Sequence, residues 1–117
     1  MITIDLPWPA AILWPNGPQP RNRGHYAAVT KKHRNLAGWA TLEALEGAKG
    51  FVPGKITLRV FAKPRGPLPD RDNCIAACKA MLDGIADGLG VNDRDFPTPE
   101  VVFCKPRDGR FAIVLEK

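Results

Sequence analysis

Twelve prolines restrict where this 117-residue chain can form helices and strands. Proline lacks the amide hydrogen that an α-helix or a central strand needs. Eight of the twelve lie in two stretches, residues 7–20 and 63–69. Both stretches are predicted to be loops, so regular structure has to lie before, between and after them.

The first three expected elements are a strand, a helix and a second strand. Residues 2–6 alternate apolar and polar side chains, as do residues 55–63, and both patterns predict strands. Between them, Thr30 is suited to cap a helix that runs to about Ala48. Apolar residues recur in that helix at nearly helical spacing: Leu36, Trp39, Ala40 and residues 42–45.

The second half of the chain predicts another helix and two strands. The helix is expected from about Asp72 to Asp87, with a core-facing stripe formed by Ile75, Cys78, Leu82 and Ile85. Gly88 and Gly90 are expected to end it. The tail predicts a hairpin around Asp108-Gly109. The order β-α-β-α-β-β predicts one small α+β domain over residues 1–117, with a mixed sheet of about four strands covered by two helices.

Charge is unevenly distributed along this basic chain. The formal net charge is +5, yet residues 68–96 hold six aspartates and three basic residues, a balance of −3 that leaves +8 elsewhere. An acidic centre in a basic protein suits an enzyme that binds a polyanion around a cation. A basic protein with a solvated acidic helix fits the charge equally well.

Asp70 and Asp72 stand two residues apart where the second helix is expected to begin. Capping that helix needs one aspartate, worth about 1 kcal/mol, and leaves the other without a structural role. Two carboxylates so close favour a cation such as Mg²⁺ between them. Asp93 could join them if the chain folds back along the helix. Lys79 and Asp83 can pair at i, i+4 on the face that Asp72 occupies, as an ordinary surface pair or as part of a phosphate site.

Basic residues before and within the first helix are candidates for contact with a DNA backbone. They are Arg21, Arg23, Lys31, Lys32 and Arg34. Cations in a first helical turn oppose the helix dipole, which favours a functional role over a merely solvated surface. His25 and His33 lie on the same basic segments and are expected to be exposed.

The remaining sequence signals exclude several classes of protein. The start, MITIDLPWP, lacks the pattern of a signal peptide, and no apolar run approaches the ~20 residues of a membrane span, so we expect a cytoplasmic protein. Cys74, Cys78 and Cys104 match no disulfide framework or zinc-finger spacing. Cys74 and Cys78 are expected to lie in the core rather than to bind metal.

The segment D-R-D-N…K-A-M-L-D-G-I…V-N-D-R-D resembles the RusA family of Holliday junction resolvases, as do the opening I-D-L-P-W-P and Trp14-Pro-Asn16. The resemblance implies that Asp70, Asp72 and Asp93 are catalytic carboxylates that bind Mg²⁺, with Mn²⁺ as a possible substitute. Asp95 is the alternative to Asp93 as the third carboxylate. Asp93 is preferred because Asn92-Asp93 occupies the place of the family's paired acids. The family lysine follows the Asn by three residues, whereas Lys79 follows Asn73 by six, so Lys79 is interpreted as the equivalent residue after a three-residue insertion.

The same resemblance implies an activity and partners. The expected function is Mg²⁺-dependent hydrolysis of phosphodiesters that resolves four-way junctions in DNA recombination and repair, inside a bacterial or phage-infected cell. The expected assembly is a homodimer, because two symmetric cuts require two sites related by a twofold axis. A non-catalytic DNA-binding protein and a metal nuclease for other branched DNA are the alternatives.

Overall fold

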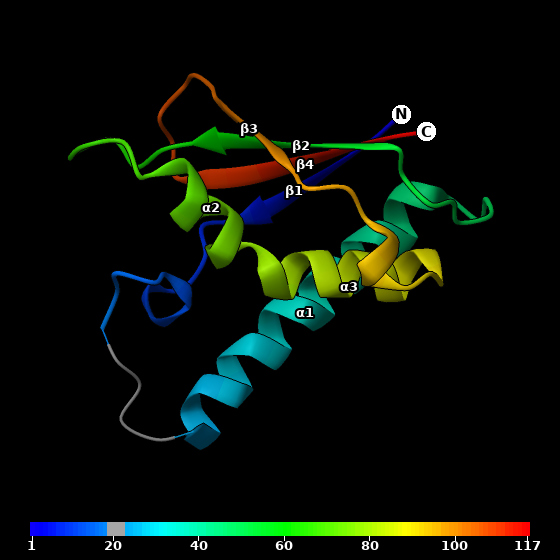
Figure 1. Ribbon diagram of the computed structural model, residues 1–117, viewed down its shortest axis with the longest axis horizontal. Helices are drawn as coiled ribbons and strands as arrows, with labels where there is room; N and C mark the ends of the chain where they lie inside the picture. Colours follow the sequence, from blue (N-terminus) through cyan, green and yellow to red (C-terminus); the bar gives the residue numbers. More distant parts are fainter. Residues whose placement is uncertain (19–22) are drawn as a thin grey trace.

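A four-stranded sheet with helices on one face forms the body of the protein (Figure 1). The computed structural model describes residues 1–18 and 23–117. The strands are β1 (Ile2–Pro7), β2 (Lys55–Phe61), β3 (Glu100–Phe103) and β4 (Arg110–Glu116). The helices are α1 (Arg23–Leu45), α2 (Arg71–Ala77) and α3 (Lys79–Leu89), with short 3₁₀ turns η1 (Ala11–Leu13) and η2 (Asp93–Asp95). The predicted α+β architecture is confirmed.

The sheet order is β1-β4-β2-β3. β4 pairs antiparallel with both β1 and β2, while β3 pairs parallel with β2. The predicted hairpin between the last two strands is therefore wrong, because β2 lies between them. Residues 111–115 of β4 are all buried, as suits a central strand, whereas β3 is short and partly exposed, as suits an edge.

Helix α1 begins at Arg23, seven residues before Thr30, the predicted cap. Thr30 does not cap it but lies inside it, where its hydroxyl donates a hydrogen bond to the Tyr26 carbonyl oxygen at 2.9 Å. Lys31 and Lys32 consequently lie in the third turn. The argument from the dipole at a helix start does not apply to them.

The side of α1 that faces the core is not the predicted apolar stripe. His33, Ala37, Thr41 and Leu45 are buried, whereas Leu36, Trp39 and Leu42 are 42%, 74% and 58% exposed. His33, expected at the surface, is 8% exposed, and its Nε2 accepts a hydrogen bond from the Ala10 amide at 3.3 Å. Burial, and then the charge of Lys32, lowers the pKa of His33.

The predicted helix 72–87 is divided into α2 and α3 at Cys78. The Cys78 amide is shared between the carbonyl oxygens of Cys74 at 3.1 Å and Ile75 at 3.2 Å, a three-centre bond typical of a helix end. The expectation that Cys74 and Cys78 belong to the core is confirmed. Burial raises the pKa of the Cys78 thiol to about 12, so it stays protonated and inert.

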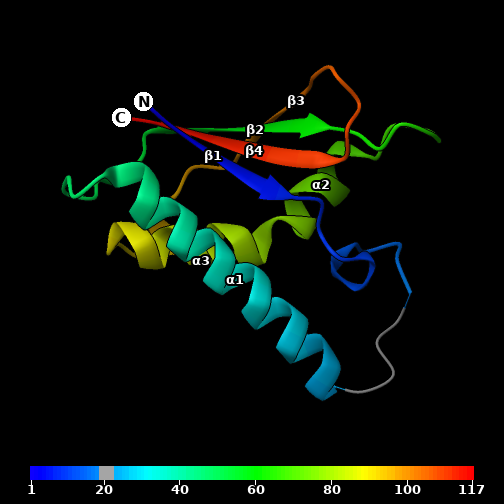
Figure 2. The same cartoon turned by 180° about the vertical axis from the view of Figure 1, so that it is seen from behind.

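Helices α1 and α3 approach each other very closely (Figure 2). A Cβ atom on Gly84 of α3 would lie 2.0 Å from the Arg34 carbonyl oxygen, and one on Gly88 would lie 2.7 Å from the Thr41 Cβ. Only glycine fits at these two positions. The close approach brings Arg34, in the middle of α1, to the surface of α3.

Candidate functional site

Three charged side chains meet where η2 returns beside α3. The Lys79 Nζ lies 3.7 Å from Asp83 Oδ1 and 3.9 Å from Asp93 Oδ2. Gly90 ends α3 in the left-handed conformation, at φ 73°, and the chain then turns back toward the helix. The chain thus folds back along the helix, as the approach of Asp93 requires. Of the two aspartates in η2, Asp93 and not Asp95 pairs with Lys79.

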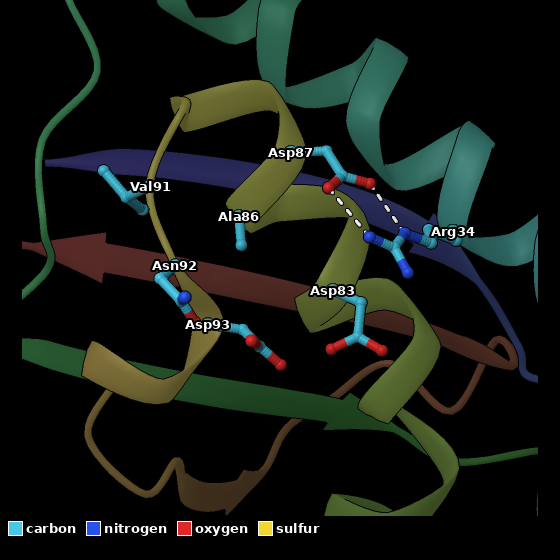
Figure 3. A pocket seen from close by; sticks show the side chains of 7 residues that line it. All are labelled: Arg34, Asp83, Ala86, Asp87, Val91, Asn92 and Asp93. Carbon is cyan, nitrogen blue, oxygen red and sulfur yellow. Dashed lines mark hydrogen bonds and ion pairs between the residues drawn. The ribbon is translucent and has the colours of Figure 1, made fainter.

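The carboxyl groups of Asp83 and Asp93 point toward one another (Figure 3). Asp83 Oδ1 is buried and has no hydrogen-bond partner among the described residues. Burial, together with a hydrogen bond to Asp93, raises the pKa of Asp83. The same hydrogen bond and the nearby Lys79 lower the pKa of Asp93. Asp83 therefore holds a proton more readily than a separate aspartate, and Asp93 less readily. A cation beside both carboxyl groups would favour the ionised form of each.

Two hollows adjoin the Asp83–Asp93 pair. One, of about 280 Å³, is also lined by Arg34, Asp87 and Asn92 (Figure 3). The other, of about 210 Å³, includes Lys79 and the loop 96–99. Both carboxyl groups line both hollows, so a phosphate or a hydrated ion could approach them from either side.

Arg34 is held in a bidentate ion pair on the wall of the first hollow. Its Nε donates to Asp87 Oδ2 at 2.7 Å and its Nη2 to Asp87 Oδ1 at 2.9 Å. This pairing raises the pKa of Arg34 and lowers that of Asp87. The guanidinium predicted for DNA contact is thus engaged by a carboxylate, and it positions α1 against α3.

Asp70 and Asp72 lie at the beginning of α2, whereas Asp93 lies in η2, which contacts α3. Asp70 is the cap of α2, since its Oδ1 accepts a hydrogen bond from the Asp72 amide at 2.8 Å. In residues 1–18 and 23–117, no three His, Cys, Asp or Glu side chains are grouped so as to hold one metal ion. Lys79 lies close to Asp93, and Asp70 lies close to Asp72. The structure does not bring these two pairs together into one site.

Asp70 lines a separate hollow of about 420 Å³, together with Trp8, Trp14, Lys63 and Arg65. The two indole rings stack with centroids 5.2 Å apart, and both pack edge-on against Phe111. The proline-rich loops thus enclose an aromatic and basic hollow beside the start of α2.

Of the residues predicted to bind DNA, Arg23, Lys31 and Lys32 are exposed on α1, and Arg21 lies outside the described residues. Asp83 was missed as a site residue. The Lys-x-x-x-Asp spacing had identified it as a partner of Lys79, but its closeness to Asp93 depends on the turn after α3.

Comparison with known proteins finds a relative in a bacterium. An uncharacterized protein from Xylella fastidiosa (strain Temecula1 / ATCC 700964) is 38% identical over 101 residues, which cover 82% of this chain and 63% of that protein. The chain thus spans less than two thirds of this relative's length. No protein-family model matches the chain. The described part of the chain contains no helix that is both long and apolar enough to cross a membrane.

Proposed function

We propose that this protein is a Mg²⁺-dependent endodeoxyribonuclease that resolves four-way DNA junctions. The observation that carries the proposal is the Asp83–Asp93 pair, two facing carboxyl groups. One buried oxygen of Asp83 has no hydrogen-bond partner among the described residues and lies 3.7 Å from the exposed ammonium of Lys79. The four-way junction is proposed as the substrate because of the resemblance to the RusA family. The relative from a bacterium agrees with action in a bacterial or phage-infected cytoplasm.

The donor set of the pair fits Mg²⁺. Magnesium is bound in proteins by one or two carboxylates, with water and substrate phosphate as the other ligands. Asp83 and Asp93 would hold the ion, which when bound polarises a phosphate and lowers the pKa of a bound water. Mn²⁺ prefers the same oxygen ligands.

The residues around the pair have separate roles in the proposal. Lys79 is 74% exposed and can donate hydrogen bonds to a phosphate oxygen, where its charge stabilises the anion that forms as the phosphodiester is attacked. Arg34 and Asp87 hold the wall of the hollow. Arg23 and Lys31, on the exposed side of α1, attract the DNA backbone.

The proposal retains Asp70 and Asp72 as catalytic carboxylates on the strength of the resemblance. Capping uses one oxygen of Asp70, while Asp72 is exposed. Asp70 lines the same hollow as Lys63 and Arg65, which suit a DNA strand that continues from Lys79 along α2. Substitution of Asp70 and Asp72 distinguishes a catalytic role of these residues from a role only in capping α2.

The test is cleavage of an end-labelled synthetic four-way junction, with and without Mg²⁺, beside a linear duplex of the same sequence. Wild-type protein is expected to make paired, symmetric cuts in the junction alone. Asp93→Asn, Asp83→Asn and Asp72→Asn are expected to abolish the cuts and preserve junction binding. Asp95→Asn is the matched control for Asp93→Asn, because it removes a charge from the same turn and should cut normally.

Three outcomes would redirect the proposal. Normal cutting by Asp83→Asn and Asp93→Asn would remove the pair from the site. Normal cutting by Asp72→Asn would leave the start of α2 with a structural role. Faster cutting of flaps or replication forks than of four-way junctions would keep the chemistry and change the substrate.

A non-catalytic DNA-binding protein is the second candidate. The observation that favours it is the capping role of Asp70, which accounts for one of the two aspartates without any metal. Such a protein would bind the junction without cutting it in any divalent metal. It should also bind more tightly when Asp83 and Asp93 are neutralised, since their charge repels DNA.

A further inference from the structure

The hollow of about 420 Å³ that Trp8 and Trp14 line has no part in the proposed Mg²⁺ site, and we call it the Trp hollow. It lies where β1 and β2 end. Pro7 and Phe61, the last residues of these strands, both pair with Arg110 of β4, so the two proline-rich loops leave the same end of the sheet on either side of β4. The arrowheads of β1 and β2 point to this end in Figure 2.

The two indole rings of the Trp hollow are held in place by the fold itself. They stack at an interplanar angle of 25°, and both pack edge-on against Phe111, which is fully buried. The Trp14 Nε1 donates a hydrogen bond to the Pro9 carbonyl oxygen at 3.2 Å. Trp8 and Trp14 are nevertheless only partly buried. A rigid aromatic pair that stays accessible is a surface on which another planar ring can stack.

The charges around the Trp hollow favour an anionic ligand. Lys63 and Arg65 line it and are exposed. Among its described lining residues, Asp70 is the only acidic one, and one of its oxygens already accepts the amide that it caps. Asn16 and Asn73 add side-chain amides, which both donate and accept hydrogen bonds. Indoles, cations and amides together match the aromatic ring, the phosphate and the polar edge of a nucleotide.

We propose that the Trp hollow binds one unpaired nucleotide of a DNA strand, with its base stacked on the indole pair and its phosphate held by Lys63 and Arg65. The volume lies within the range of about 300–1,000 Å³ of small-ligand sites. Stacking accepts any base, because every base has a π-face. The inference rests on the proposed function for the origin of the strand, which is a junction whose paired bases part at the branch point.

The Trp hollow lies a short distance along the chain from the candidate site. Asp70 caps α2 and Lys79 begins α3, so nine residues separate them, at most ~14 Å of helical rise. A DNA strand covers this length in a few nucleotides. The bound nucleotide therefore lies a few positions from the phosphate at Lys79, and the hollow positions the branch point relative to the cut.

The experiment is a fluorescence titration in EDTA, so that no metal-dependent cutting occurs. The chain has three tryptophans, so in Trp39→Phe the emission comes from Trp8 and Trp14 alone. A short single-stranded oligodeoxythymidylate is expected to quench this emission saturably. An abasic strand of the same length and charge is the matched ligand. It should bind about tenfold more weakly or less tightly still, and leave the emission unchanged, because it cannot stack.

The salt dependence of binding tests the two cations. Each phosphate neutralised on a single strand contributes about 0.7 to the slope of log K against log salt, so the double variant Lys63→Gln/Arg65→Gln should lower the slope by about 1.4. The double variant Lys49→Gln/Lys117→Gln is the matched control. It makes the same change in net charge at exposed residues beyond the opposite end of the sheet, and its slope should equal that of the parent protein.

The outcomes separate this inference from the proposed nuclease. Equal affinity for the abasic strand, binding without a change in emission, or equal slopes in the two double variants would overturn the inference. Quenching by a proline-rich peptide and not by the strand would assign the hollow to a peptide and overturn it as well. Symmetric cutting by a protein whose emission does not respond would refute the hollow and keep the nuclease. Base-dependent quenching without cutting in Mg²⁺ would support the hollow and refute the nuclease.

Discussion

Replacing Gly84 with alanine tests the contact that holds α1 against α3. The added Cβ would lie 2.0 Å from the Arg34 carbonyl oxygen, 2.9 Å from its carbonyl carbon and 3.0 Å from the Ala37 Cβ. Two of these atoms belong to the backbone, so no side-chain rotation relieves the clash and the helices must separate. Overpacking costs about 1–3 kcal/mol, sometimes more. The higher helix propensity of alanine returns about 1 kcal/mol.

A clash with backbone atoms places the overpacking cost at the upper end of this range, about 3 kcal/mol, so we expect Gly84→Ala to lower the free energy of unfolding by about 2 kcal/mol, or Tm by about 8 °C for a chain of this length. Urea and thermal denaturation followed by circular dichroism measure it. Gly38→Ala on the facing helix is the matched control: its Cβ meets only the Gly84 carbonyl region, at 3.3 Å, so it should cost much less. Equal stability of Gly84→Ala and wild type, or a larger loss for Gly38→Ala, would show that the helices do not touch here.

Three further predictions concern single titratable groups. His33 has a lowered pKa in the folded state, so its contribution to stability is complete above the unfolded pKa of about 6.5 and is lost as the pH falls through the folded pKa. Urea denaturation at several pH values should therefore show that the free energy of unfolding declines toward low pH, and His33→Asn should reduce this decline. Asp70→Ala should lose about 1 kcal/mol of stability with the α2 cap, whereas Asp70→Asn, which can still accept the Asp72 amide, should lose much less by the same assay. Mg²⁺ affinity measured by calorimetry should increase as the pH rises through the raised pKa of Asp83, and Asp83→Asn should weaken binding and flatten this dependence; equal affinity at all pH values in wild type would contradict the proposed ligand pair.

Local patterns in the sequence predicted the helices and strands themselves better than they predicted which of these elements lie side by side. Strict alternation located β2 to within two residues, because the pattern follows directly from a half-buried strand. The hairpin prediction failed because adjacency in sequence does not determine which strand inserts between others. The start of α1 was missed because residues 23–29 carry no apolar periodicity, and the side of α1 that faces the core contains His33 and Thr41, which a hydropathy pattern assigns to the surface.

The candidate site was predictable only in part. The Lys79–Asp83 pair follows from helical spacing, and the Asp70 cap from its place before a helix. The approach of Asp93 depends on the turn at Gly90, and the closeness of Arg34 to this region depends on the glycines between α1 and α3. These are tertiary contacts between segments that carry no common sequence signal.

The interruption at Cys78 makes α3 a separate structural unit with its own starting phase. In an uninterrupted helix, three extra residues would rotate everything after them by about 60° and advance it by about 4.5 Å. Here the polypeptide begins a new helix at Lys79, so Lys79 and Asp83 keep their relation to η2 regardless of the length of α2. We therefore expect an insertion or deletion in α2 to be absorbed at Cys78, with the positions of Lys79 and Asp83 relative to Asp93 unchanged.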